Sequence, residues 1–135
     1  MRILAVDHGA ARAGLALSDP SGTIASPLTV VEPPDPAGIA SIAEDEGAEL
    51  VIVGLPVSLS GQESDQAAEA RRFAAELERR LSVPVETYDE RLTTRMADQS
   101  ARAGAAAPAD ALAAAHLLES YLQSRDAAAE EQTDG

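Results

Sequence analysis

The 135-residue sequence contains no cysteine and no tryptophan, and it has only one phenylalanine and two tyrosines. The absence of cysteine excludes disulfide bonds, thiol nucleophiles and thiolate zinc sites. Because aromatic residues are so scarce, the core has to be built from Leu, Val, Ile and Ala. No apolar run is long enough to span a bilayer, and Asp7 interrupts the apolar start too early for a signal peptide. We therefore expect a cytoplasmic protein without a membrane segment.

Lysine is also absent, so all of the 10 basic residues are arginines, and they face 23 acidic residues. The resulting net charge of −13 repels nucleic acid at long range. The length fits a single domain with a substantial core. We expect that domain over residues 1–124, followed by an acidic, disordered tail at 125–135, which has almost nothing to bury.

The first nineteen residues contain the pattern around which the rest of the chain is organised. An apolar strand over residues 3–6 leads to Asp7, a turn between Gly9 and Gly14 follows, and a second strand over 15–17 returns. Four adjacent apolar residues favour a central strand that is covered on both faces. The glycines permit a tight turn and a close approach of the backbone to a ligand. Asp7 then either binds a ligand or accepts hydrogen bonds from turn amides.

The remaining chain alternates strand and helix patterns. It predicts a third strand over 23–31 with Pro27 at an edge or a bulge, further strands over 49–54 and 83–88, and helices over 36–46, 62–81, 93–102 and 108–123. Short connections imply that the first three strands pair antiparallel, and the strand-helix-strand units imply that the others pair parallel. We expect an α/β fold with a mixed five-stranded sheet and flanking helices.

Three carboxylates stand where ligands bind in such sheets, outside the carboxyl ends of strands. Asp7 ends the first strand, Glu90 ends the last strand beside Asp89, and Asp110 lies in the first turn of the final helix. Hard oxygen ligands of this kind suit Mg²⁺ or Mn²⁺, and two such ions clamp both oxygens of a phosphodiester displacement. The alternatives are structural. Asp110 is favourable at a helix N-terminus through the dipole alone, and Asp89 or Glu90 could cap the following helix.

The other candidate residues are weaker. His8 faces the opposite way from Asp7, and His116 lies off the helical face of Asp110, so packing is the better interpretation of both. Ser18 has no histidine partner suited to a nucleophile triad. Phosphate contacts are better assigned to the arginines close to the acids in sequence, which are Arg12, Arg91 and Arg95.

Four segments together resemble the YqgF/RuvX family of pre-16S rRNA nucleases and Holliday-junction-resolvase-like proteins: DHGAARAGLALSD (7–19), VIVGLPVSLSG (51–61), DERLTT (89–94) and DALAAAHLLESYL (110–122). The resemblance implies an RNase H-like fold and a metal-dependent nuclease that matures the 5′ end of the small-subunit ribosomal RNA precursor. By position, Asp7, Glu90 and Asp110 match the family's acidic triad. The matches expected to shape the site or meet the substrate backbone are Gly9, Arg12, Gly14, Gly54, Pro56, Arg91 and Thr94.

One departure from the family pattern concerns charge. Many relatives carry a Lys/Arg-rich segment before the third acid, whereas residues 103–109 of this chain contain no positive charge. Nucleic-acid affinity then depends on the remaining arginines and metal ions, or on recruitment by a ribosomal subunit. The alternatives are a DNA junction resolvase, which needs a dimer although the chain shows no obvious dimer helix, and a weakly catalytic binding module. We expect a monomer or a weak dimer. A kinase-like phosphotransferase is disfavoured because it needs two such domains.

Overall fold

The computed structural model describes residues 1–56, 64–90 and 109–133, with side chains described as far as residue 125. The predicted helix over 93–102 and most of the loop after Pro56 lie outside these residues, as do the candidate site residues Arg91, Thr94 and Arg95.

A mixed five-stranded sheet in the order β3-β2-β1-β4-β5 forms the centre of the molecule. Its strands are β1 (Ile3–His8), β2 (Ala13–Ser18), β3 (Ala25–Val31), β4 (Leu50–Leu55) and β5 (Val85–Asp89). The β1–β2 and β2–β3 pairs are antiparallel, and the β1–β4 and β4–β5 pairs are parallel. The predicted topology is therefore confirmed. β1 occupies the middle of the sheet, as its uninterrupted apolar run indicates.

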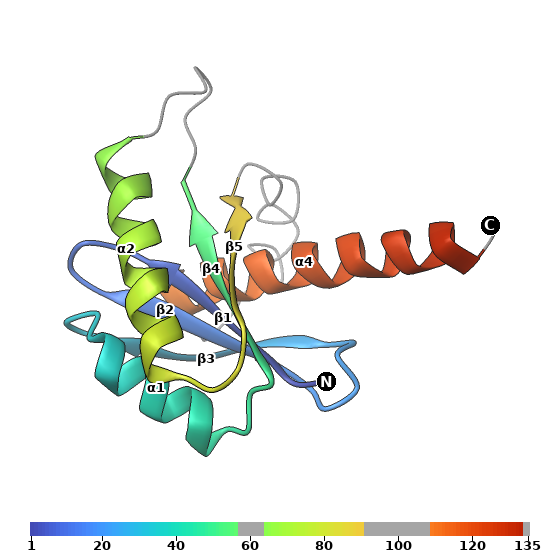
Figure 1. Cartoon of the computed structure of the whole chain (residues 1–135), viewed down its shortest axis with the longest axis horizontal. Coiled ribbons are helices and arrows are strands. Elements are labelled where there is room, and N and C mark those ends of the chain that lie inside the picture. Colours follow the sequence, from blue (N-terminus) through green and yellow to red (C-terminus); the bar gives the residue numbers. More distant parts are fainter. Residues whose placement is uncertain (57–63, 91–108, 134–135) are drawn as a thin grey trace.

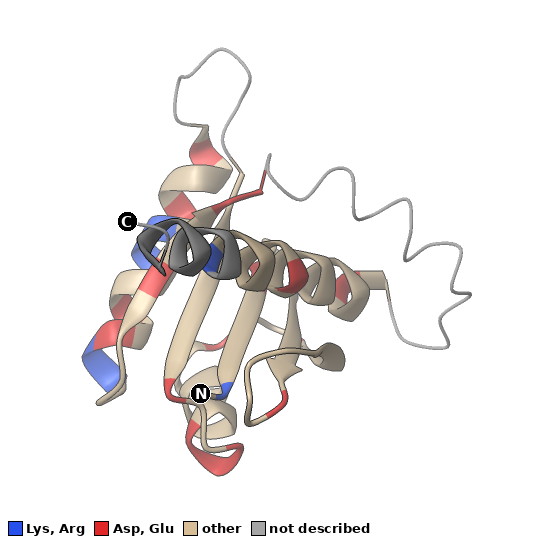
Figure 2. Cartoon of the chain, turned by 90° about the vertical axis from the view of Figure 1, so that its right-hand side faces the viewer, with Lys and Arg blue, Asp and Glu red and all other residues tan. Residues whose placement is uncertain are grey.

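Helices cover both faces of the sheet (Figure 1). α1 (Pro36–Asp45) and α2 (Asp65–Arg80) pack on one face, and α4 (Ala109–Thr133) packs on the other. Alternate residues of β1 serve the two layers: Leu4 and Val6 join the α1/α2 core, whereas Ile3 and Ala5 join the α4 core. Figure 2 shows α4 crossing in front of the strands. By this alternation, Asp7 faces α4 and His8 faces α2.

β3 is an edge strand, as its proline predicts. Pro27 pairs with Ala16, and the register shifts between Leu15 and Ala16, which leaves Leu28 as an extra residue on β3. The shift is a β-bulge. Pro27 therefore lies both on an edge strand and next to a bulge, the two settings in which a strand tolerates proline.

Two helix ends differ from the sequence prediction by more than one residue. α2 begins at Asp65 because Ser64 caps it, its hydroxyl accepting a hydrogen bond from the Ala67 amide at 3.1 Å. α4 continues to Thr133, into the segment for which composition predicts a disordered tail. The repeated alanines of that segment have the highest intrinsic helix propensity, so the backbone continues the helix that precedes it.

The turn between β2 and β3 is organised by an aspartate. The Asp19 carboxylate accepts hydrogen bonds from the amides of Thr23 at 2.7 Å and Ile24 at 2.8 Å, and from the hydroxyl of Ser21. These donors, with the Ile24 amide foremost, hold the pKa of Asp19 well below its usual range. Asp19 is thus an acid whose charge stabilises a turn.

Candidate active site

Asp7 lies at the C-terminal end of the central strand, between two glycines of the neighbouring strands. Gly14 of β2 is its register partner, and Gly54 of β4 follows Val53, the partner of Val6. Neither glycine presents a side chain, so the sheet is open on both sides of the Asp7 carboxylate. Each of the other two predicted acids approaches through one of these openings.

Gly14 brings Asp110 to the sheet. A Cβ atom at Gly14 would lie 1.9 Å from the carbonyl oxygen of Asp110 and 2.3 Å from its carbonyl carbon, so any other residue would displace the first turn of α4. The backbone of Asp110 therefore rests directly on β2 beside Asp7, and the negative charge of Asp110 adds to burial, the larger cause, in raising the pKa of Asp7. The glycine is required by this close approach.

Gly54 makes the equivalent space for Glu90. A Cβ atom at Gly54 would lie 2.5 Å from Glu90 Oε1, so the glycine leaves room for the carboxyl group over the end of β4. β5 is tied to α4 just before this residue, because Tyr88 and Ser120 share a hydrogen bond of 2.9 Å and the rings of Tyr88 and Tyr121 pack edge to face at 5.6 Å. These contacts hold the end of β5 against α4 and so set the position of Glu90.

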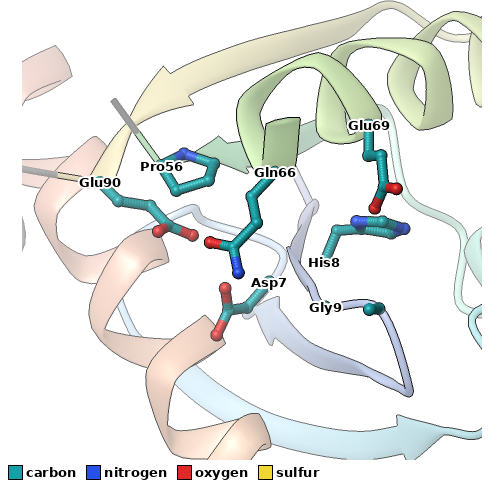
Figure 3. A pocket seen from close by; sticks show the side chains of 8 residues that line it. Asp7, His8, Gly9, Pro56, Gln66, Glu69 and Glu90 are labelled. Carbon is teal, nitrogen blue, oxygen red and sulfur yellow. The ribbon is translucent and has the colours of Figure 1, made fainter. Parts of the chain in front are cut away.

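Asp7 and Glu90 meet as a carboxyl pair (Figure 3), and a hydrogen bond joins them. Burial raises the pKa of Glu90 to about 8, helped by that hydrogen bond and by the charges of Asp7 and Asp89. Burial also raises the pKa of Asp7, although the hydrogen bond from Glu90 partly offsets the rise. Glu90 is therefore the protonated member of the pair, and its hydroxyl donates the hydrogen bond to the Asp7 carboxylate. Two desolvated carboxyl groups that share a proton are a favourable place for a cation.

Asp110 has a different partner from the other two acids. Its Oδ2 lies 3.0 Å from Nε of Arg12, and both side chains are about half exposed, at 44% for Asp110 and 54% for Arg12. Within the described residues, no three acidic or histidine side chains are grouped closely enough to ligate one ion together. Asp7 is thus hydrogen-bonded to Glu90. Asp110 lies beside Asp7, but its ion pair is with Arg12.

A pocket of about 200 Å³ opens beside the acid pair on the α2 side of the sheet. Asp7, Glu90, Gly9 and Pro56 line it, and so do three side chains that sequence reasoning did not assign to the site, which are His8, Gln66 and Glu69. In Figure 3 the Gln66 amide points toward the acid pair and the Glu69 carboxylate lies next to the His8 ring. Gln66 and Glu69 are exposed positions of a helix, and only the packing of α2 against β1 shows that they face the site.

Several other candidates have structural surroundings that explain them. The Gly9 amide donates a hydrogen bond to the Arg12 carbonyl at 2.9 Å, which closes the turn after β1. The His8 ring packs on Phe73 with centroids 4.5 Å apart, and His116 is 9% exposed within α4, so the packing interpretation of both is confirmed. Ser18 accepts a hydrogen bond from the Ile3 amide at 2.8 Å, which ties β2 to β1.

Among the described residues, few basic side chains lie near the site. Figure 2 shows short basic segments that are separated by acidic and neutral ones. Arg12 lies at the site through its contact with Asp110, whereas Arg79 and Arg80 pair with Glu76 on α2. None of the helices in the described ranges combines the length and the apolar character that crossing a bilayer demands.

The chain is similar to several known proteins. Residues 1–124 match a family described as "RuvX: Holliday junction resolvase". A Chloroflexus aurantiacus protein named "Putative pre-16S rRNA nuclease" is 41% identical over 133 residues, which cover 91% of this chain and 87% of that protein. A protein of the same name from Thermobifida fusca is 50% identical over 105 residues, covering 76% and 66% of the two chains. Thermus thermophilus RuvC, solved with a Holliday junction substrate, superposes with a TM-score of 0.69 at 14% identity and covers 94% of this chain and 96% of that one.

Proposed function

Since the chain belongs to the RuvX family, we propose that it is a nuclease that hydrolyses phosphodiester bonds in structured RNA with the help of Mg²⁺ or Mn²⁺, and that its substrate is the 5′ region of the 16S rRNA precursor. The relatives' names supply the substrate class, and the family supplies the reaction class. We place the activity in the cytoplasm, and association with a ribosomal subunit would bring this acidic protein to its RNA.

The observation that carries the proposal is the carboxyl pair of Asp7 and Glu90 at the end of the central strand. Burying two acids against each other costs folding free energy at neutral pH, because one of them holds a proton that it would otherwise release, so a purely structural role gives no reason for the arrangement. A divalent cation would take the place of the shared proton and compensate the charges of both carboxylates. The oxygen ligands present are those that Mg²⁺ and Mn²⁺ prefer.

In this proposal each residue has a defined task. Asp7 and Glu90 hold the cation, and Asp110 adds a third carboxylate from the first turn of α4. A bound divalent cation supplies positive charge at the scissile phosphate and lowers the pKa of a water molecule. Arg12 stands at the mouth of the site, where its guanidinium is able to exchange the Asp110 carboxylate for a phosphate oxygen.

The glycines and Pro56 shape the surface on which the RNA backbone would lie. Gly14 and Gly54 leave the space that Asp110 and Glu90 occupy beside Asp7, and Gly9 and Pro56 form part of the pocket wall. Arg91, Thr94 and Arg95 follow Glu90 directly in the chain, and we assign to them further contacts with the substrate backbone.

DNA junction cleavage is the second candidate, because the matched family is described as a Holliday junction resolvase. It would use the same acids but needs two sites that cut opposite strands, and hence a dimer. The fold shared with RuvC, at 14% identity, concerns architecture alone. A weakly catalytic binding module is the third candidate, but it leaves the buried acid pair unexplained.

The direct test compares a fragment of the 16S rRNA precursor with a four-way DNA junction, each incubated with the purified chain in Mg²⁺, in Mn²⁺ and in EDTA. We expect cleavage of the RNA that requires the metal and is lost in Asp7→Asn. Asp45→Asn, an exposed acid at the end of α1, is the matched control and should leave the rate unchanged. Failure of the wild type to cut RNA, or full activity of Asp7→Asn, would refute the proposal.

A further inference from the structure

We propose that the pocket beside the acid pair binds a nucleobase of the nucleotide whose phosphate is cleaved, and that guanine is its best complement. This inference rests on the proposed nuclease function, because it assigns the pocket to the same RNA. It concerns the wall formed by His8, Gln66 and Glu69, which the hydrolysis itself does not use.

The position of the pocket decides which part of the substrate can enter it. The volume of about 200 Å³ is shared between the acid pair and the α2 wall, so a group inside it lies next to the bond being cut. A phosphate held at Asp7 and Glu90 through a cation therefore brings its own nucleotide to the pocket. Specific reading of RNA depends on bases that are unpaired and turned out of the stack, and a concave site of this kind receives such a base.

The charge of the lining excludes a phosphate from the α2 side. Glu69 adds a carboxylate to the acid pair of Asp7 and Glu90, and the remaining polar side chains facing the space are the neutral amide of Gln66 and the ring of His8. An anion would be repelled from this wall. A neutral group that presents N–H donors is the complementary ligand, and among the parts of a nucleotide only the base has such donors in a planar edge.

The spacing of Gln66 and Glu69 matches one base edge. The two residues are three apart on α2, which places them on the same helical face with Cβ atoms about 5–6 Å apart. A carboxylate accepts only, so Glu69 suits two adjacent donors, and Gln66 is able to donate its amide N–H to a carbonyl oxygen. The Watson–Crick edge of guanine offers N1–H and N2–H beside O6. Uracil offers a single N–H donor between two carbonyls, so Glu69 would accept one hydrogen bond from it and would place its second oxygen against a carbonyl oxygen.

The wall is held in place by its own packing. The His8 ring lies against Phe73, which follows Glu69 by one turn of α2, and the two ring planes are inclined by 35°. Because Phe73 is 6% exposed and belongs to the core, His8 is fixed between the core and the pocket. The flat faces of His8 and Pro56 then provide surfaces on which a base can stack.

The first test measures binding without catalysis. The ¹⁵N-labelled protein is titrated with guanosine and with uridine, and backbone amide shifts are followed by NMR. We expect guanosine to shift the resonances of Gly9, Gln66 and Glu69 and to bind about fivefold to a hundredfold more tightly than uridine, which is the discrimination typical of a bidentate base contact. Glu69→Gln and Gln66→Ala should remove this preference. Glu78→Gln, exposed on α2 and absent from the pocket lining, should keep it.

The second test uses cleavage. Once the cut bond has been mapped, RNAs that differ only in the adjoining base, with one carrying an abasic nucleotide, are compared under single-turnover conditions. Faster cleavage beside guanine than beside the other bases, with this difference in rate lost in Glu69→Gln, supports the base pocket. Equal rates for all bases and for the abasic RNA, or equal binding of guanosine and uridine, overturn the base pocket and leave the nuclease proposal intact. Selective guanosine binding by a protein that cuts no RNA refutes the nuclease proposal instead.

Discussion

The two ends of the β1–β2 hairpin each carry an aspartate, and the surroundings shift the pKa values of the two in opposite directions. Asp19, at the start of the β2–β3 turn, receives hydrogen bonds from two amides and a hydroxyl, and its pKa is lowered. Asp7, at the far end of β1, is desolvated beside Glu90 and Asp110, and its pKa is raised. One acid is surrounded by donors, and the other is surrounded by acids. The first arrangement stabilises the ionised acid in the folded chain, whereas the second opposes ionisation, and in the proposed function a cation compensates that cost.

The difference shows why the acidic composition alone is a poor guide to the site. Most of the acidic residues in the described ranges lie on helix surfaces or in turns, where water or backbone donors stabilise the charge. The glycines Gly14 and Gly54 leave the space in which Asp110 and Glu90 approach Asp7 from separate elements. The site is thus defined by the surroundings of its carboxylates.

The comparison predicts opposite phenotypes for two charge-neutralising substitutions. Glu90→Gln should lower cleavage on the order of a thousandfold, since a cation held by the pair is worth several kcal/mol in the transition state. The same variant should be more stable than the wild type in EDTA above pH 8. Asp19→Asn should lower the melting temperature and keep cleavage within about twofold. Melting curves and single-turnover rates for both variants check this. A stability loss in Glu90→Gln would show that the acid pair is structural.

Adding one methyl group at either of two glycines tests the placement of Asp110. Gly14→Ala should destabilise the protein by about 3 kcal/mol, at the upper end for overpacking, because the new Cβ meets the Asp110 backbone at 1.9 Å. Gly38→Ala in α1, where the nearest atom is 3.5 Å away, should instead stabilise by about 0.5–1 kcal/mol. Urea unfolding measures both values. Equal effects would mean that α4 does not depend on its approach to β2.

Divalent cations should stabilise the site end of the molecule alone. At a concentration a hundredfold above its dissociation constant, Mg²⁺ or Mn²⁺ should add about 2.7 kcal/mol by mass action, and EDTA should remove it. Asp7→Asn should abolish the gain, whereas Asp19→Asn should retain it in full. The measurement is the melting temperature against metal concentration at fixed ionic strength. A gain that persists in Asp7→Asn would place the cation elsewhere.

The pH dependence of stability should have opposite signs at the two ends. The pKa of Glu90 is raised from 4.5 to about 8, so in the absence of metal its contribution is present below pH 4.5 and is lost as the pH rises toward 8. The lowered pKa of Asp19 gives a contribution that is present above pH 3.8 and is lost as the pH falls. Unfolding free energies between pH 2 and 9 should flatten at high pH in Glu90→Gln and at low pH in Asp19→Asn.

Much of the fold could be predicted from local sequence because each element has its own pattern. The continuous apolar runs of β1 and β4 indicate buried parallel strands, and Pro27 indicates an edge. The meeting of Asp7 and Glu90 follows from the rule that strand ends converge at one rim of the sheet. The sequence singles out Gly14 and Gly54, but it does not show that the Asp110 backbone and the Glu90 side chain occupy the space beside them.

What could not be predicted depends on contacts between elements. Gln66 and Glu69 look like ordinary exposed residues of an amphipathic helix, and their place at the pocket is set by the way α2 packs on β1. The pairing of Arg12 with Asp110 depends likewise on where α4 meets β2. α4 is longer than its composition indicates, because the alanines after residue 125 favour a helix although that segment has almost nothing to bury.

The smallest expected effect on stability concerns the ion pair between Arg12 and Asp110. Both side chains are about half exposed, so Arg12→Gln should change the unfolding free energy by less than about 1 kcal/mol. If Arg12 leaves Asp110 for the substrate, the same variant should raise KM for RNA more than it lowers kcat, and Arg12→Lys should restore only part of the affinity because a lysine cannot bind a phosphate in bidentate fashion. A destabilisation well above 1 kcal/mol with unchanged KM would make Arg12 a structural partner of α4, and the site end would then resemble the Asp19 turn.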